Sequence, residues 1–317
     1  MKMFRVIYFL LGVILVTGTF ATGEYGLSKV NQSIYEKACE AERNVAEIQF
    51  PDFHVSDYKV RFYNGHHDYV VQGNSVVKEQ PVLDTFAGST LKVNGEWQVI
   101  VPEYELFAEL FNIAGAAGSM MEGTMAFSEN TYTEHSHTAT ICHEAFHAWQ
   151  YSNWEQEIEA LTKEIEAVGE KNRETAIVNR IDSNDTCVVL FEKEMELLQE
   201  AYQCQDDAGR RNFVMEALAV HAQRQRELSA GLAALETFLE NLEGGAMYVE
   251  AMVYRPLEGE EAFLDYYMGD FVYSNGSAKY YTMGMLKCML LDTLLPGWKE
   301  SWSLEETLDV LLDRACR

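Results

Sequence analysis

Residues 141–149 read Ile-Cys-His-Glu-Ala-Phe-His-Ala-Trp and contain the pattern His-Glu-x-x-His in an apolar surrounding. Such a surrounding is typical of a buried helix. Two histidines four residues apart on a helix project from one face, so both imidazoles can reach one metal ion. Glu144 lies beside them, where it can accept a proton from a water activated by the metal. The segment therefore predicts a zinc-binding helix with His143 and His147 as ligands.

A catalytic zinc site needs a third protein ligand, and the sequence offers one at Leu242-Glu243-Gly244-Gly245-Ala246-Met247-Tyr248. This stretch resembles the Glu-Gly-x-Ala-x-Tyr segment of aminopeptidase-N-like peptidases, which belong to the gluzincin class of zinc metallopeptidases. His147-Ala148-Trp149 is also similar to their His-x-Trp. The resemblance implies that Glu243 is the third ligand of a Zn²⁺ ion. Glu250 and Glu240 are the alternatives.

A third histidine would be a different solution, but the residues that follow His147 supply neither the glycine nor the histidine of H-E-x-x-H-x-x-G-x-x-H. His135 and His137 form a His-x-His pair upstream. Histidines in a polar loop are usually solvated. A position in the substrate cleft is therefore favoured for this pair over a role as metal ligands.

Tyr281-Thr282-Met283-Gly284 resembles the Tyr-x-Lys-Gly segment of the same peptidases, with Met283 in place of the lysine. In that family the tyrosine hydroxyl stabilises the tetrahedral intermediate, so the resemblance implies this catalytic role for Tyr281. Tyr280 and His221 are the alternatives. Ordinary core or surface packing is the competing interpretation of any single tyrosine.

The chain departs from the family in the spacing of its ligands, because Glu243 follows His147 by 96 positions. Three apolar stripes at helical spacing fill this interval and predict a helical insertion at about 155–242. Their members are Ile158, Leu161, Ile165 and Val168; Val188, Phe191, Met195, Leu198 and Tyr202; and Leu228, Leu232, Leu235, Leu239 and Leu242.

A second departure concerns substrate binding. The aminopeptidases carry Gly-x-Met-Glu-Asn, whose glutamate binds the substrate's α-amino group. The nearest segment here is Gly123-Thr124-Met125-Ala126-Phe127, with Ala126 at the position of that glutamate. The resemblance therefore implies an endopeptidase rather than an aminopeptidase.

The remaining sequence predicts an α+β fold. Residues 27–48 have a helical pattern, and β-rich runs between 57 and 101 contain Asn64-Gly65 and Asn94-Gly95, which predict antiparallel hairpins. A helix at 103–117 and a strand at 123–127 should follow, and from residue 138 the pattern is helical, with a last helix from about Leu304. We expect a β-rich portion at 22–130 and a mainly helical, zincin-like catalytic portion at 131–317.

Composition narrows the classes of function. The 317 residues include 24 basic and 50 acidic side chains, giving a formal net charge of −26. This balance argues against nucleic acid and anionic membranes as partners. Six cysteines occur without a Cys-x-x-Cys pair, which argues against a cysteine zinc site. Of these, Cys142 and Cys288 are expected in the core.

The N-terminus predicts export. Lys2 and Arg5 precede an apolar run at 6–16, and Thr19 and Ala21 provide a small-x-small cleavage pattern. Residues 1–21 are therefore interpreted as a signal peptide, which would make the protein secreted, periplasmic or cell-surface.

Together these features predict a secreted zinc metallopeptidase that hydrolyses peptide or protein substrates, with Glu144 and Tyr281 catalytic. The alternative is a secreted binding or interaction protein on a degenerate metallopeptidase scaffold. The intact His143, Glu144 and His147 count against that alternative, because a binding protein does not need a general base.

Overall fold

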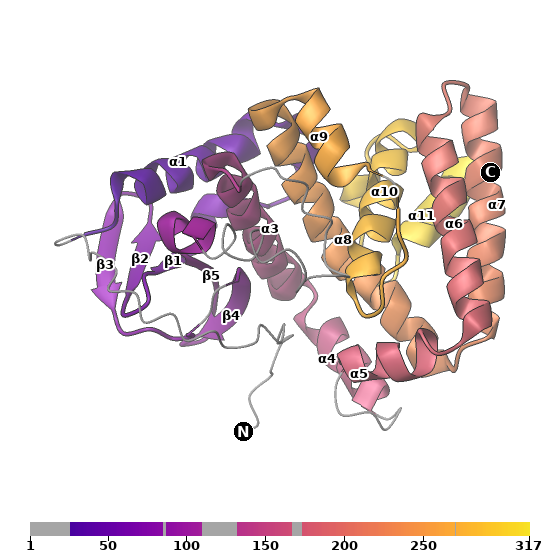
Figure 1. The fold of residues 1–317 in the computed structure, drawn as a ribbon, viewed down its shortest axis with the longest axis horizontal. Helices are drawn as coiled ribbons and strands as arrows, with labels where there is room; N and C mark the ends of the chain where they lie inside the picture. The colour runs from indigo at the N-terminus through magenta and orange to yellow at the C-terminus, as the bar shows by residue number, and fades with distance from the viewer. Residues whose placement is uncertain (1–25, 85–86, 110–131, 167–172, 270) are drawn as a thin grey trace.

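The computed structural model describes residues 26–84, 87–109, 132–166, 173–269 and 271–317. The predicted signal peptide at 1–21 and the predicted strand at 123–127, with Ala126, lie outside these residues. The fold is α+β, as predicted: a five-stranded sheet lies at one end of the molecule and the long helices fill the rest (Figure 1).

The sheet has the order β3-β2-β1-β5-β4. Its strands are β1 (Val60–Tyr63), β2 (Asp68–Gln72), β3 (Ser75–Glu79), β4 (Ser89–Val93) and β5 (Glu96–Pro102). The hairpins predicted at Asn64-Gly65 and Asn94-Gly95 are antiparallel, as β1–β2 and β4–β5. The sheet as a whole is mixed, because β1 and β5 run parallel, which was not predicted. The chain passes from β3 at one edge of the sheet to β4 at the opposite edge, and β5 then lies beside β1. In the connection, the backbone amide of Val82 donates to Asp68, and Asp84 accepts a hydrogen bond from the hydroxyl of Tyr63.

Asn94 and Gly95 both have positive φ, at 53° and 90°, and form the predicted tight turn between β4 and β5. Strand β3 was not predicted from the sequence. Every residue of this edge strand is exposed, so it lacks the alternation of buried and exposed positions by which a strand is recognised.

Helix α1 (Lys29–Asn44) is followed by two short 3₁₀ turns, η1 (Ala46–Ile48) and η2 (Val55–Asp57). Residues 104–109 are helical; the remainder of the helix predicted at 103–117 lies outside the described residues. Helix α3 (Glu134–Asn153) starts at a capping box between Thr133 and Ser136 and packs against α1, β4, β5 and α8.

Within the described parts of 155–317, the helical portion continues with ten further elements. They are α4 (Glu155–Glu166), α5 (Arg173–Ala176), the π-helical η3 (Ile177–Ile181), α6 (Asp185–Gln203), α7 (Asp207–Arg226), α8 (Ala230–Glu258), α9 (Glu260–Tyr267), α10 (Ala278–Leu294), the 3₁₀ turn η4 (Trp298–Glu300) and α11 (Leu308–Cys316). Cys142 and Cys288 are buried, as predicted.

In the part of 155–242 that the structure describes, the predicted insertion consists of helices joined by short turns. Helices α6 and α7 pack as a hairpin against α10 and α11 (Figure 1). Leu228, the first residue of the third predicted stripe, lies before α8, whereas Leu232 to Leu242 lie within it. Helix α8 continues unbroken through Glu243, so no helix boundary marks the predicted end of the insertion at about 242. The last predicted helix also begins later, at Leu308 rather than Leu304.

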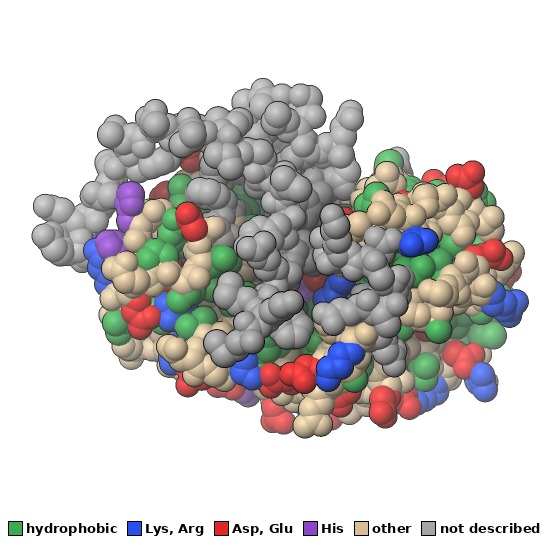
Figure 2. All heavy atoms as spheres, turned by 90° about the horizontal axis from the view of Figure 1, so that it is seen from below, with side chains coloured by type: hydrophobic (Ala, Val, Ile, Leu, Met, Phe, Trp, Pro, Cys, Tyr) green, Lys and Arg blue, Asp and Glu red, His purple; other side chains and the backbone are tan. Residues whose placement is uncertain are grey.

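Among the described residues, no helix combines the length and apolarity that crossing a membrane requires. In the view of Figure 2, acidic and basic side chains are interspersed over the described surface.

Candidate metal centre

Helix α3 has two functionally different faces. Phe146 and Trp149 point into an aromatic cluster with Phe50 and Trp302. His143 and His147 occupy another face, with ring centroids 4.8 Å apart, and only 7% and 6% of their surfaces are exposed. The aromatic packing holds the helix rigidly, so the two histidines are fixed in one orientation.

Glu243 of α8 meets the two histidines. Its Oε2 lies 3.2 Å from Nε2 of His147, and one ligand atom from each of His143, His147 and Glu243 can be chosen so that all lie within 4.8 Å of one another. All three side chains are buried. These three residues, which we call the metal group, can hold a metal ion. Two imidazoles and one carboxylate are a ligand set that suits zinc.

The contacts made by the Nδ1 atoms of His143 and His147 support this fit. Nδ1 of His147 lies 2.8 Å from Oε1 of Gln150, whose amide donates to the carbonyls of Asn241 and Leu242 on α8. Nδ1 of His143 lies 2.9 Å from Oε2 of Glu250, without an aligned hydrogen bond. Both Nδ1 atoms thus face protein, which leaves both Nε2 atoms for a metal.

Glu250 was the first alternative ligand, but its carboxylate lies beside Nδ1 of His143, on the side of the ring away from the metal group. Its other oxygen accepts a hydrogen bond of 2.9 Å from Tyr267 of α9. Glu250 is therefore placed to orient His143 and lies outside the group that could hold a metal ion. Neither Gln150 nor this role of Glu250 was identified from the sequence, although Gln150 follows His147 by three residues and thus shares its helix face.

Glu144 projects towards the edge strand β4. Oγ1 of Thr90 lies 2.9 Å from its Oε2, and a Cβ placed on Gly88 would come within 2.7 Å of its Oε1. Burial raises the pKa of this carboxyl, while the neighbouring His143 and His147 oppose the shift. A carboxylate held beside a metal position, with a raised pKa, is suited to accept and return a proton.

Tyr281 of α10 lies opposite α3. Its ring stacks on His143 with centroids 6.1 Å apart and an angle of 15° between the planes. Its hydroxyl hydrogen-bonds to Glu243, and burial followed by the charge of Glu243 raises its pKa well above the ordinary value. The hydroxyl thus stays protonated and can serve as a donor at the metal group.

The alternatives to Tyr281 lie elsewhere. The hydroxyl of Tyr280 is 2.9 Å from Oε1 of Glu236, and Nδ1 of His221 is 3.1 Å from Oε1 of Glu194. Glu240, the other alternative ligand, binds Lys287 at 2.6 Å. Tyr280, His221 and Glu240 therefore lie outside the metal group.

The upstream histidines also differ from expectation. His137 is 1% exposed, lies among Phe62, Tyr104 and Tyr132, and burial lowers its pKa to about 3. His135 lies 3.2 Å from Glu258. The expectation of a cleft position was therefore wrong for His137, which is a neutral core residue.

The charges of the metal group are strongly linked. Burial disfavours the charged forms of His147 and Glu243, but their mutual attraction outweighs it. The pKa of His147 is raised to about 9 and that of Glu243 is lowered to about 2. Without a metal, the pair is an imidazolium and a carboxylate at neutral pH. A metal ion and this proton therefore compete for His147.

Two glycines allow Glu243 and Tyr281 to approach each other. A Cβ on Gly244 would overlap the backbone of Gly284, and one on Gly284 would overlap the carbonyl oxygen of Glu240. Helices α8 and α10 therefore cross in backbone contact, one residue from Glu243 and three from Tyr281. Because the helices cross so closely, Tyr281 on α10 reaches Glu243 on α8.

We expect Gly284→Ala to force α8 and α10 apart, lowering the free energy of unfolding by about 1–3 kcal/mol and weakening metal binding. Urea unfolding and metal titration measure the two effects. Gly269→Ala is the matched control, because its Cβ would meet only the carbonyl of Asp265, at 3.5 Å. Equal results for the two variants would show that the crossing is not tight.

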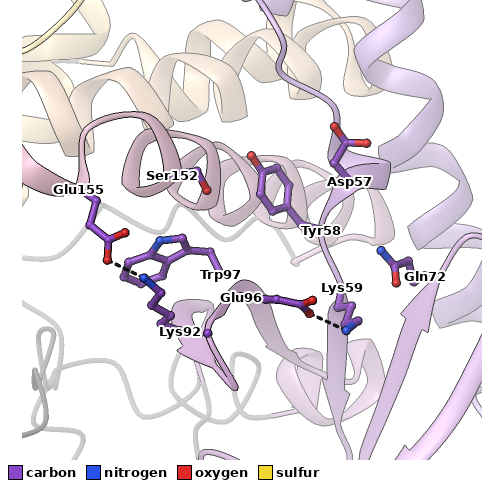
Figure 3. Close-up of a pocket in the computed structure, with 10 residues that line it drawn as sticks. Asp57, Tyr58, Lys59, Gln72, Lys92, Glu96, Trp97, Ser152 and Glu155 are labelled. Atoms are coloured by element: carbon purple, nitrogen blue, oxygen red, sulfur yellow. Dashed lines mark hydrogen bonds and ion pairs between the residues drawn. The ribbon is translucent and has the colours of Figure 1, made fainter.

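A surface pocket of about 440 Å³ lies at the C-terminal end of α3, away from the metal group (Figure 3). The ring of Trp97 stacks on that of Tyr151, with centroids 4.6 Å apart, and Tyr151 in turn contacts the ring of His147. Tyr151 thus lies between the pocket residue Trp97 and the metal group. The charged side chains Lys92 and Glu155 are already paired across the pocket at 2.6 Å. None of the three metal-group residues lines this pocket.

Comparison of the chain with protein-family models, with curated proteins and with solved structures found no match. The interpretation of the site therefore depends on its own geometry.

Proposed function

We propose that this protein is an exported zinc metallopeptidase of gluzincin type, with His143, His147 and Glu243 as the zinc ligands. The observation that carries the proposal is the meeting of these three buried side chains, from two helices, with Glu144 beside them and Tyr281 opposite. Catalytic zinc sites have three protein ligands and keep one position open, and His143, His147 and Glu243 would supply the three ligands.

When bound, zinc acts as a Lewis acid and lowers the pKa of a water molecule towards 7. The carboxylate of Glu144 takes the proton of the attacking water and passes it to the leaving amine. Thr90 holds that carboxylate in place through its hydroxyl. The Tyr281 hydroxyl donates to the oxygen on which negative charge develops. Peptide-bond hydrolysis is the reaction that these roles describe.

The purified protein should hold about one zinc ion per chain, because three protein ligands form one complete catalytic site. We expect His143→Ala, His147→Ala and Glu243→Ala each to lose it, as measured by elemental analysis after dialysis. Glu250→Ala should retain zinc but bind it about 10–100-fold more weakly. His135→Ala is the control and should keep full occupancy. Retention of zinc by Glu243→Ala would refute the ligand assignment.

The proposed substrates are peptides or proteins, cleaved internally. N-acetylated peptides provide the direct test, since an endopeptidase accepts them as readily as free peptides. A strict requirement for a free α-amino group would favour an aminopeptidase instead.

A further inference from the structure

A second group of buried charges lies among helices α6, α7, α8, α10 and α11. It is composed of Glu194, His221, Arg224, Glu236, Glu240, Lys287 and Asp309. Arg224, Glu236 and Glu240 are completely buried, and Lys287 is 1% exposed. Burying so many charges is costly, and well-packed apolar residues often stabilise a fold as well or better. Net stability is therefore a poor explanation for this group.

The group resembles a metal site, but its cation is already present. Glu194, His221, Glu240 and Asp309 have ligand atoms within 4.8 Å of one another. The ammonium Nζ of Lys287, however, lies 2.6 Å from Glu240, 2.7 Å from Asp309 and 3.2 Å from Glu194. This ammonium occupies the position that a metal ion would need, so the role of the group must be sought elsewhere.

The position of the group relative to the metal centre indicates that role. Glu240 lies three residues before Glu243 on α8, so the two side chains share one side of the helix. Lys287 lies six residues after Tyr281 on α10, and Gly284 lies between them at the close crossing. The Lys287–Glu240 ion pair therefore joins the same two helices that carry Glu243 and Tyr281.

We propose that Lys287 and Glu240 are positioning residues for the metal centre, because their ion pair fixes α10 against α8 and so sets the placement of Tyr281 relative to Glu243. The inference rests on the proposed function of that centre. An ion pair is directional and sensitive to distance, and in some proteins buried polar or ionic groups fix the register between helices. The Lys287–Glu240 pair therefore has the properties needed to set the position of α10 relative to α8. Small errors in placement at a catalytic centre are expensive in rate.

Asp309 offers a matched control. It contacts the same ammonium as Glu240, but it lies on α11 and so links α10 to a helix without metal-group residues. Glu240→Gln and Asp309→Asn each remove one negative charge from Lys287 while preserving shape. Only Glu240→Gln weakens the link between α8 and α10. A purely structural role predicts similar effects for both variants.

The test measures kcat and KM on a peptide, together with the visible spectrum of the Co²⁺-substituted protein, for Glu240→Gln, Lys287→Met and Asp309→Asn. We expect the first two to keep KM and lower kcat by about 10²-fold, the cost typical of a small misplacement. Their Co²⁺ spectra should differ from wild type, because absorption reports coordination geometry. Asp309→Asn should retain both the wild-type kcat and spectrum, even if its melting temperature falls.

Unchanged kcat and spectra in Glu240→Gln would overturn the positioning role, as would equal changes in Asp309→Asn. Glu240→Gln decides the matter if Lys287→Met does not fold. A wild-type protein that binds Co²⁺ but cleaves no peptide would refute the proposed function, while the spectra would still decide the positioning role. A wild-type protein that binds neither Zn²⁺ nor Co²⁺ would refute both the proposed function and the positioning role.

Discussion

Replacement of Glu144 by glutamine is expected to give a folded, zinc-loaded protein whose kcat is about 10²–10⁴-fold lower than that of wild type. Glutamine has nearly the same shape as glutamate and can still bond to Thr90, but it cannot accept the proton of the attacking water. The metal group does not include Glu144, so zinc occupancy should not change. Steady-state kinetics on a peptide, with zinc measured on the same sample, check this result.

Glu134→Gln is the matched control for this experiment. It makes the same substitution in the first turn of the same helix, where 43% of the side chain is exposed, and should leave kcat unchanged. A Glu144→Gln variant with wild-type kcat would eliminate Glu144 as the proton acceptor. Loss of zinc in that variant would instead give it a role in metal binding.

Tyr281→Phe is expected to lower kcat by about 10²–10³-fold, the usual cost of losing one oxyanion donor. Negative charge develops on the carbonyl oxygen only in the transition state, so the loss should affect kcat more than KM. The substitution removes one oxygen and keeps the ring that stacks on His143. Fold and zinc content should therefore survive, and both can be measured alongside kcat.

The neighbouring tyrosine provides the control. Tyr280→Phe removes a hydroxyl that bonds to Glu236, outside the metal group, while Arg224 still pairs with Glu236. This variant should keep a kcat close to wild type, although its stability should fall because a buried hydrogen bond is lost. A loss of kcat in Tyr280→Phe but not in Tyr281→Phe would transfer the catalytic role to Tyr280.

The sequence predicted those parts of the site that depend on local geometry. The four-residue spacing of His143 and His147 places them on one helix face wherever the helix packs. The segment around Glu243 identified the residue that the structure brings to His147, across 96 residues of sequence. The α+β class was also predictable, because strand-rich and helix-rich patterns occupy separate parts of the chain.

The features that sequence analysis missed depend on long-range contacts. Nothing local indicates that β5 pairs in parallel with β1, since this pairing depends on how the chain crosses the sheet. Glu250 was an alternative to Glu243 as the third ligand. Seven residues separate them, so both face α3, but only packing decides which histidine nitrogen each one meets.

The continuity of α8 also constrains how this protein can change in length. Each residue of an α-helix advances the side chains by about 100° around the axis. A single insertion between Glu240 and Glu243 would therefore turn Glu243 away from the histidines, or Glu240 away from Lys287. Insertions in the turn between α6 and α7 rotate neither side chain. Homologous chains should therefore vary freely in length at 204–206 and keep the spacing from 240 to 250 constant.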